Sequence, residues 1–267
     1  FLAEPEAAAL AAGALNAPGE TGLIVDIGGG TSDFSVFRST GQGIEILASY
    51  GIRLGGTDFD SAISLDCVMP LFGRGGARRK VLGTDLTPVP NAIYVDLATW
   101  EKIPFVYTAK TRRMVAEMVT LAQEPEKMKR LLTVVDDALG HDVAFAVEAG
   151  KIAVQAEGRA AQIDLDVVER GLCVPLSKSG VAQCLTRHSA RLQAALDETL
   201  IRAGLTAEHV DRVIYVGGSS QMAQVGAVLT DRFPKARHDQ SDVFTAVAHG
   251  LALATGLEPQ TARGSTA

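Results

Sequence analysis

Residues 23–37 read Leu-Ile-Val-Asp-Ile-Gly-Gly-Gly-Thr-Ser-Asp-Phe-Ser-Val-Phe. An apolar run leads into Asp26 and three consecutive glycines, and a second stretch of alternating polarity resumes at Phe34. Apolar and alternating runs on either side of a glycine cluster are typical of strands, so the segment predicts a β-hairpin with the glycines at its turn. Because glycine has no Cβ and tolerates positive φ, three in a row allow backbone amides to converge on an anion, and phosphate is the natural guest.

Two neighbours extend this prediction toward a nucleotide. Asp26 offers an acceptor for a hydrated cation, and Thr31 offers a hydroxyl donor for a terminal phosphate. The alternative is a plain glycine-rich turn beside an incidental acid. A dinucleotide fingerprint and a Walker loop are both excluded, since the glycines are contiguous and lead into a strand.

Two further glycine pairs follow along the chain. Gly55 and Gly56 precede a helical pattern that runs toward Met69, with Thr57 in position to cap it. A glycine pair before a helix more often reflects ordinary turn chemistry than a ligand contact. Gly217-Gly-Ser-Ser220 stands between the apolar run Val213–Val216 and a helical pattern over 221–233. Such a strand, turn and helix would let a planar ligand or a ribose lie against bare backbone.

Composition excludes several classes of protein. The 267 residues are 47% hydrophobic and 21% charged, with a net charge of −6, which favours a folded domain over a general nucleic-acid surface. No apolar run approaches a membrane span and no signal-peptide pattern opens the chain, so we expect a cytoplasmic protein without a membrane partner. The basic run 74–80 is interpreted as a solvated loop.

Cysteines and histidines give no motif for metal binding or covalent catalysis. Cys67, Cys173 and Cys184 are odd in number and widely spaced, so we expect reduced structural thiols. The five histidines form no pair at zinc-ligand spacing, and no Gly-x-Ser-x-Gly elbow occurs.

The periodicities predict an α/β organisation. We expect a helix over 5–14, three strands within 22–50, helices near 111–122, 126–138 and 141–155, strands over 160–166 and 172–176, one long helix over 178–203, a strand at 213–216 and two final helices ending near Thr255. Residues 256–267 carry no apolar period and predict a frayed tail.

Five motifs in this order resemble the ATPase domain of the DnaK-type heat-shock chaperones, which has the actin-like (ribonuclease H-like) fold. The motifs are Glu4-Pro-Glu-Ala-Ala-Ala-Leu10, Asp26-Ile-Gly-Gly-Gly-Thr-Ser-Asp33, Leu54-Gly-Gly-Thr-Asp-Phe-Asp60, Val216-Gly-Gly-Ser219 and Ala246-Val-Ala-His-Gly250. Stretches such as Met69-Pro-Leu-Phe-Gly73 and Glu124-Pro-Glu-Lys-Met128 bring the chain closest to the short YegD-type paralogues.

The resemblance implies the second lobe of that ATPase. Residues 18–60 and 177–256 would form its core subdomain, a mixed sheet with flanking helices, and residues 61–176 an inserted, smaller α+β subdomain. Residues 1–17 would be a remnant helix of the first lobe and 257–267 a flexible tail. The first lobe, with its own phosphate hairpin and catalytic lysine, is expected to precede Phe1, so the chain is interpreted as a fragment.

The resemblance also implies roles for individual residues. Glu4, Asp26 and Thr31 would belong to the catalytic machinery, and Asp26 and Asp33 would lie near Mg²⁺ and a monovalent cation such as K⁺. The residues implied to contact ATP or ADP are Gly28, Gly29, Gly30, Thr31, Gly55, Gly56, Glu148, Lys151, Gly217, Gly218, Ser219 and Gln221. For Glu148 and Lys151, an ordinary ion pair between residues three apart on a helix is an equal alternative.

Two departures bear on function. The chaperones place an arginine after the matched lysine and another after the Gly-Gly-Ser motif, where this chain has Ile152 and Gln221. Both cationic stacking partners for the base are therefore absent. Three functions stay open: an ATP/ADP-binding lobe of a DnaK-like ATPase that cannot hydrolyse ATP alone, an actin-fold metabolite kinase lobe, or a pseudo-ATPase interaction module. The implied partners are nucleotide, the first lobe, and co-chaperone or nucleotide-exchange proteins.

Overall fold

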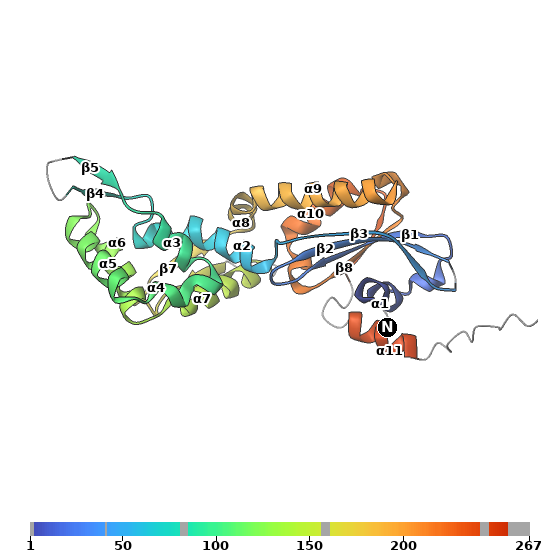
Figure 1. Cartoon of the computed structure of the whole chain (residues 1–267), viewed down its shortest axis with the longest axis horizontal. Coiled ribbons are helices and arrows are strands. Elements are labelled where there is room, and N and C mark those ends of the chain that lie inside the picture. The colour runs from blue at the N-terminus through green and yellow to red at the C-terminus, as the bar shows by residue number, and fades with distance from the viewer. Residues whose placement is uncertain (1–2, 41, 81–84, 156–160, 241–245, 256–267) are drawn as a thin grey trace, which may run out of the picture. The chain divides into compact units, whose positions relative to one another are not determined.

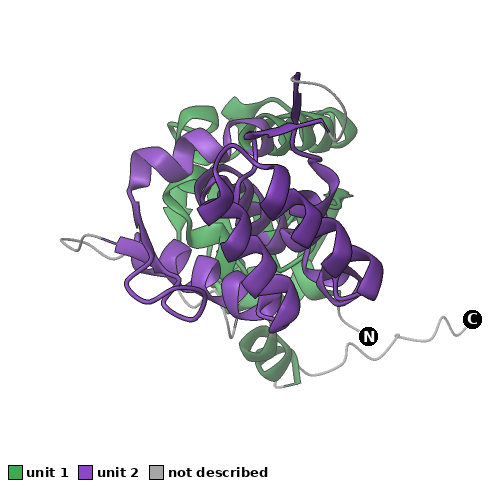
Figure 2. Ribbon diagram, turned by 90° about the vertical axis from the view of Figure 1, so that its left-hand side faces the viewer, with its two compact units in different colours: residues 1–55, 189–267 green, residues 56–188 purple. Residues whose placement is uncertain are grey.

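The computed structural model describes residues 3–40, 42–80, 85–155, 161–240 and 246–255. Contacts divide the chain into two compact units, residues 1–55 with 189–267 and residues 56–188 (Figure 2). The assignment of these stretches to a core, an inserted subdomain and a remnant helix stays a prediction. The expected tail over 256–267 lies outside the described residues.

The first unit is built on a mixed five-stranded sheet in the order β3-β2-β1-β8-β9 (Figure 1). The strands are β1 (Thr21–Ile27), β2 (Ser32–Ser39), β3 (Ile44–Ile52), β8 (Arg212–Val216) and β9 (Arg237–Asp239). β1, β2 and β3 pair antiparallel, which confirms the predicted hairpin, whereas β1, β8 and β9 pair parallel. β9 was not predicted, because three residues containing arginine, histidine and aspartate carry no strand pattern.

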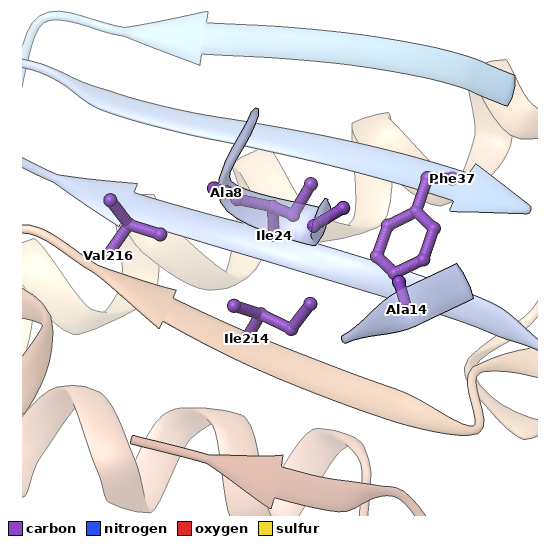
Figure 3. Packing of buried hydrophobic residues seen from close by; sticks show 7 residues of the cluster. Ala8, Ala14, Ile24, Phe37, Ile214 and Val216 are labelled. Carbon is purple, nitrogen blue, oxygen red and sulfur yellow. The ribbon is translucent and has the colours of Figure 1, made fainter. Parts of the chain in front are cut away.

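Small side chains allow helix α1 (Glu4–Ala11) to lie close to one face of the sheet. Ala8 and Ala9 pack with Ile24, Ile214 and neighbouring buried residues, and Figure 3 shows the cluster from close by. Helix α11 (Ala246–Thr255) lies beside α1 (Figure 1). A methyl group on Gly250 would overlap the Ala7 carbonyl, so the alanine-rich helix and this glycine are matched by close packing.

The opposite face of the sheet is also buried. Ile24 points toward α1, so its neighbours Leu23 and Val25 point the other way, and both are fully buried. Figure 1 shows α9 (Thr186–Ala203) on that side of the sheet. Its buried residues recur at helical spacing and are Leu192, Ala195, Leu196, Thr199 and Leu200. This unit also contains α10 (Ala223–Arg232).

The second unit is mainly helical. Its helices are α2 (Gly56–Ile63), α3 (Ala92–Leu97), α4 (Ile103–Val106), α5 (Ala109–Leu121), α6 (Pro125–Asp136), α7 (Gly140–Ala153) and α8 (Lys178–Cys184). Two small antiparallel hairpins pair β4 (Ala77–Arg79) with β5 (Leu86–Pro88), and β6 (Ala161–Asp164) with β7 (Cys173–Leu176). None of the described helices is long and apolar enough to cross a bilayer.

Three sequence predictions were wrong in detail. The helix expected over 178–203 is interrupted at Leu185, since the Thr186 hydroxyl bonds the carbonyls of Ala182 and Gln183 and competes with the regular ladder. α2 begins at Gly56, so Thr57 lies within its first turn and is not its N-cap. The basic run is not a plain loop, because part of it forms β4.

A buried arginine joins the ends of three elements in the first unit. Arg212 is 3% exposed; its guanidinium donates to the Ala12 carbonyl after α1, lies 2.5 Å from Asp239 of β9, and lies 3.8 Å from Glu20. Removing the cation would take a buried counter-charge away from both carboxylates, while Arg237, 3.7 Å from Glu20, would remain.

We therefore expect Arg212→Met to lower the free energy of unfolding by about 3 kcal/mol. Arg232→Met is the matched control, because its 2.7 Å pair with Asp197 is exposed and should be worth less than about 1 kcal/mol. Urea titration of the three proteins measures both values. Equal losses in the two variants would contradict a special role for the buried pair.

Candidate functional site

The triple-glycine turn joins the carboxyl end of β1 to the start of β2. The Gly28 amide donates to the Thr31 carbonyl at 3.0 Å and closes the turn. Gly29, Gly30 and Thr31 are exposed. The amides of Gly30 and Thr31 donate to no acceptor in the part of the chain that the structure describes. Two exposed residues of the turn thus carry amides without an acceptor among the described residues.

The fold itself does not require these glycines. None of Gly28, Gly29 and Gly30 has a positive φ, so the turn does not use the left-handed backbone that glycine tolerates. A Cβ on Gly29 or Gly30 would meet nothing within 4 Å. Their small size therefore leaves open space beside these amides, and close approach of a ligand to the backbone needs such space.

Two other predicted glycines pack directly on this turn. A Cβ on Gly55 would lie 2.5 Å from the Gly29 carbonyl oxygen and from the Gly30 nitrogen. Gly217 has φ +77°, and a Cβ there would lie 2.5 Å from the Ile27 oxygen and 2.9 Å from an Asp26 carboxylate oxygen. Gly55 and Gly217 are thus required sterically.

The sheet topology explains this meeting. β1 and β8 are adjacent and parallel, and Asp26 is paired with Val216, so the turns after both strands emerge at the same edge. In the second turn Gly218 and Gln221 are exposed and Ser219 is half-buried. The Ser220 hydroxyl donates to the Gly217 carbonyl at 2.7 Å and fixes that turn.

Three carboxylates face one cavity of about 380 Å³ in the first unit. Glu4 on α1, Asp26 on β1 and Asp33 on β2 line it, together with Pro5 and Tyr50 among others. Burial, followed by the charges of Glu4 and Asp33, raises the pKa of Asp26 to about 6. Within the described residues, no group of three acids, histidines or cysteines is arranged to hold a metal directly.

The second unit contains Gly56, Glu148 and Lys151. Lys151 is 7% exposed, and its ammonium lies 2.8 Å from Asp60 and 3.5 Å from the Gly56 carbonyl. Among the described residues, its salt-bridge partner is Asp60 and not Glu148. Burial raises the pKa of Asp60 against the opposing effect of Lys151, and the charge of Glu148 adds to the rise.

Asp60 is the residue that sequence reasoning missed in this group. It lies one helical turn after Gly56 on α2 and, with the exposed Glu148, lines a small cavity of about 160 Å³. The sequence signal that could have found it is an acid one helical turn after Gly56, at the end of the Leu54–Asp60 motif. Ile152 is 62% exposed, so its apolar side chain is available at the surface of this unit.

The raised pKa of Asp26 predicts a pH effect on stability. Because the folded-state pKa of about 6 exceeds the ordinary value of 3.8, the folded chain binds more protons than the unfolded chain between these values, and stability falls as pH rises through them. Asp26→Asn should raise the melting temperature at pH 7.5 by about 2 °C and lose that advantage near pH 4. Asp231→Asn is the control, because Asp231 on α10 is exposed. Calorimetry at both pH values measures the melting temperatures. An effect of Asp26→Asn that does not change with pH would contradict the prediction.

Comparison with known proteins agrees with this geometry. The family model described as "Hsp70 protein" matches residues 1–74 and 121–263, so residues 75–120, which hold β4, β5, α3 and α4, lie outside the match. The chain is 28% identical over 261 residues to "Heat shock 70 kDa protein BIP3" of Oryza sativa subsp. japonica, covering 96% of this chain and 31% of that protein.

A bacterial relative gives the same result. The chain is 27% identical over 259 residues to "Chaperone protein DnaK" of Thermus thermophilus, covering 96% of this chain and 34% of that protein. It thus spans about a third of the length of the curated relatives it matches. The expected likeness to short YegD-type paralogues stays a prediction. The mixed sheet with its helices is that of an actin-like ATPase lobe, and the chain belongs to the Hsp70 family.

Proposed function

We propose that this chain is the nucleotide-binding second lobe of a DnaK-like chaperone ATPase, and that the turn over 28–31 receives the terminal phosphates of ATP and ADP. The observation that carries the proposal is the open space at Gly29 and Gly30 beside the amides of Gly30 and Thr31, which have no acceptor among the described residues. Backbone donors of this kind bind oxyanions with charge-assisted hydrogen bonds. The Thr31 hydroxyl adds a side-chain donor.

The carboxylates of the first unit suit a hydrated magnesium ion. Asp26, Glu4 and Asp33 supply hard oxygen acceptors around one cavity, and Mg²⁺ keeps several waters and binds through few carboxylates plus phosphate oxygens. When bound, the ion would neutralise charge on the phosphates. Asp26 and Glu4 would accept hydrogen bonds from its waters, and Asp33 is assigned to a monovalent cation such as K⁺. A cation also favours the charged form of Asp26 and so offsets the cost of burial.

The turn over 217–221 is assigned to the nucleoside. Gly217 lies against Asp26, so the exposed backbone of Gly218 and the side chain of Ser219 lie close to the phosphate turn. Glu148 and Ile152 on α7 are assigned to the ribose and base edge. Lys151, whose ammonium is already bound to Asp60, positions α7 against α2 in this proposal.

Hydrolysis would need more than this chain supplies. The proposal assigns the attacking water to carboxylates and the stabilisation of the γ-phosphate to donors from two lobes. The relatives are about three times as long as this chain, which leaves room for a first lobe and for regions that contact co-chaperones or exchange proteins.

We expect the 267-residue chain alone to release no phosphate above background from ATP in the presence of Mg²⁺. Two or three absent charge-assisted bonds at about 1.5–3 kcal/mol each correspond to at least a hundredfold weaker binding. A malachite-green assay measures the release. Turnover that rises linearly with the concentration of this chain would contradict the expectation.

Substitution of the turn glycines separates binding from folding. Gly29→Ala or Gly30→Ala should change the free energy of unfolding by less than about 0.5 kcal/mol, because the new methyl group meets open space. The same methyl group should weaken ADP binding about tenfold to a hundredfold by displacing phosphate from the amides.

Gly226→Ala is the matched control, since Gly226 also has open space around it but lies within α10. It should stabilise the helix by about 0.5–1 kcal/mol and leave ADP binding unchanged. Calorimetric titration of ADP with Mg²⁺ measures the affinities. Unchanged affinity in both turn variants would refute the phosphate assignment.

A pseudo-ATPase module is the second candidate. Ile152 and Gln221 stand where the resemblance expects cationic side chains, and both are exposed, so cation–π support for the base of roughly 0.5–2 kcal/mol is absent. Nucleotide binding without phosphate release by the full-length protein would favour this candidate over an active ATPase.

A further inference from the structure

Two cysteines far apart in the sequence lie side by side in the second unit. Cys67 lies in a π-helical turn, Ser64–Val68, that follows α2, and Cys184 is the last residue of α8. Their sulfur atoms are 3.8 Å apart across a separation of 117 residues. Both side chains are half-buried, whereas the third cysteine, Cys173 on β7, is exposed. The sequence could not show this pairing, because the thiols come from separate helical segments.

One member of the pair, Cys184, borders an open cavity. Cys184 lines a cavity of about 530 Å³ together with polar and charged residues, among them Asp66, Arg74 and Arg187. A small polar oxidant can therefore approach the Cys184 sulfur, and the half-buried Cys67 sulfur lies 3.8 Å from it. The hydrogen bond between the two thiols lowers the pKa of Cys67 and, with burial, raises the pKa of Cys184. Cys67 is thus the better thiolate and Cys184 the proton donor beside it.

We propose that Cys67 and Cys184 form a site of reversible oxidation, a dithiol that hydrogen peroxide converts into an intramolecular disulfide. The proposal rests on the juxtaposition of the two sulfur atoms beside an open polar cavity, and it is independent of nucleotide binding. Closure requires the sulfur atoms to approach by about 1.8 Å, to the 2.03–2.05 Å of a disulfide.

The chemistry balances in two steps. The Cys67 thiolate attacks one peroxide oxygen, the O–O bond breaks, and the hydroxide that leaves takes a proton to give water; Cys67 becomes a sulfenic acid. The sulfur of Cys184, on losing its proton, attacks the Cys67 sulfur, the S–O bond breaks and a second water forms. Two thiols lose two electrons and two protons, and one peroxide is reduced to two waters.

The disulfide would join the two segments that connect this unit to the rest of the chain. The unit begins at Gly56 and ends at His188, and Cys67 and Cys184 lie shortly inside those boundaries. The cross-link would close almost the whole unit into one covalent loop. Closing a long loop restricts the unfolded chain, so oxidation should stabilise the unit against unfolding.

The test is peroxide treatment of the 267-residue chain at pH 7.5. We expect the number of thiols titrated after denaturation to fall from three to one. Mass spectrometry of a non-reduced digest should show the Cys67 and Cys184 peptides linked, with the loss of two hydrogen atoms. The melting temperature should rise by about 5 °C, and dithiothreitol should reverse all three changes.

Three variants provide the controls. Cys173→Ser should fall from two thiols to none and form the same cross-link, whereas Cys67→Ser and Cys184→Ser should form none. Serine at a half-buried position can destabilise the fold, so Cys67→Ala and Cys184→Ala are measured beside the two serine variants. The mass analysis of the unaltered chain tests the cross-link without any variant. Three results would each overturn the proposal. The first is separate oxidation of Cys67 and Cys184 to acids, and the second is a cross-link through Cys173. The third is the survival of all three thiols when glutathione in the same tube is fully oxidised.

Discussion

The backbone-to-backbone approach at the carboxyl edge of β1 and β8 is the constraint on which the first unit depends. Gly217 must leave β8 with φ +77° and with no side chain, because the Ile27 carbonyl and the Asp26 carboxylate occupy the space of a Cβ. Gly55 meets the triple-glycine turn in the same way. Three chain segments far apart in the sequence can therefore meet within van der Waals distance only because glycine occupies both contact points.

This close approach has an electrostatic cost. It partly removes Asp26 from water and places it near Glu4 and Asp33, and burial is the largest cause of its raised pKa. A fold under selection for stability alone would carry an uncharged residue there. The buried Arg212 is different, since its charge is matched by Glu20 and Asp239. A carboxylate that lacks such a partner in the described structure is one that a bound cation would stabilise.

Local patterns predicted the strands, the hairpin and most helices, because the signals are contained within a few residues. The Leu23–Phe37 segment carries its own alternation and turn. Tertiary pairing was not predictable in the same way. β9 forms because β8 offers a parallel edge, the π-helical turn at Ser64–Val68 has no sequence signature, and the break at Leu185 follows from one threonine hydroxyl. The order of motifs predicted the family, whereas the roles of its individual residues stay predictions.

Lys151 shows why spacing alone could not assign a side chain in the second unit. It lies three positions after Glu148 on α7, and both sequence interpretations, an i, i+3 ion pair and a ribose contact, used that spacing. Its ammonium instead meets Asp60 on α2, a partner 91 residues away. A lysine that is 7% exposed needs a counter-charge at short range, and Asp60 supplies it at 2.8 Å. Because removal of either partner would leave a buried, unpaired charge, the pair fixes α7 against α2. Glu148 and Ile152 are among the exposed side chains of this helix.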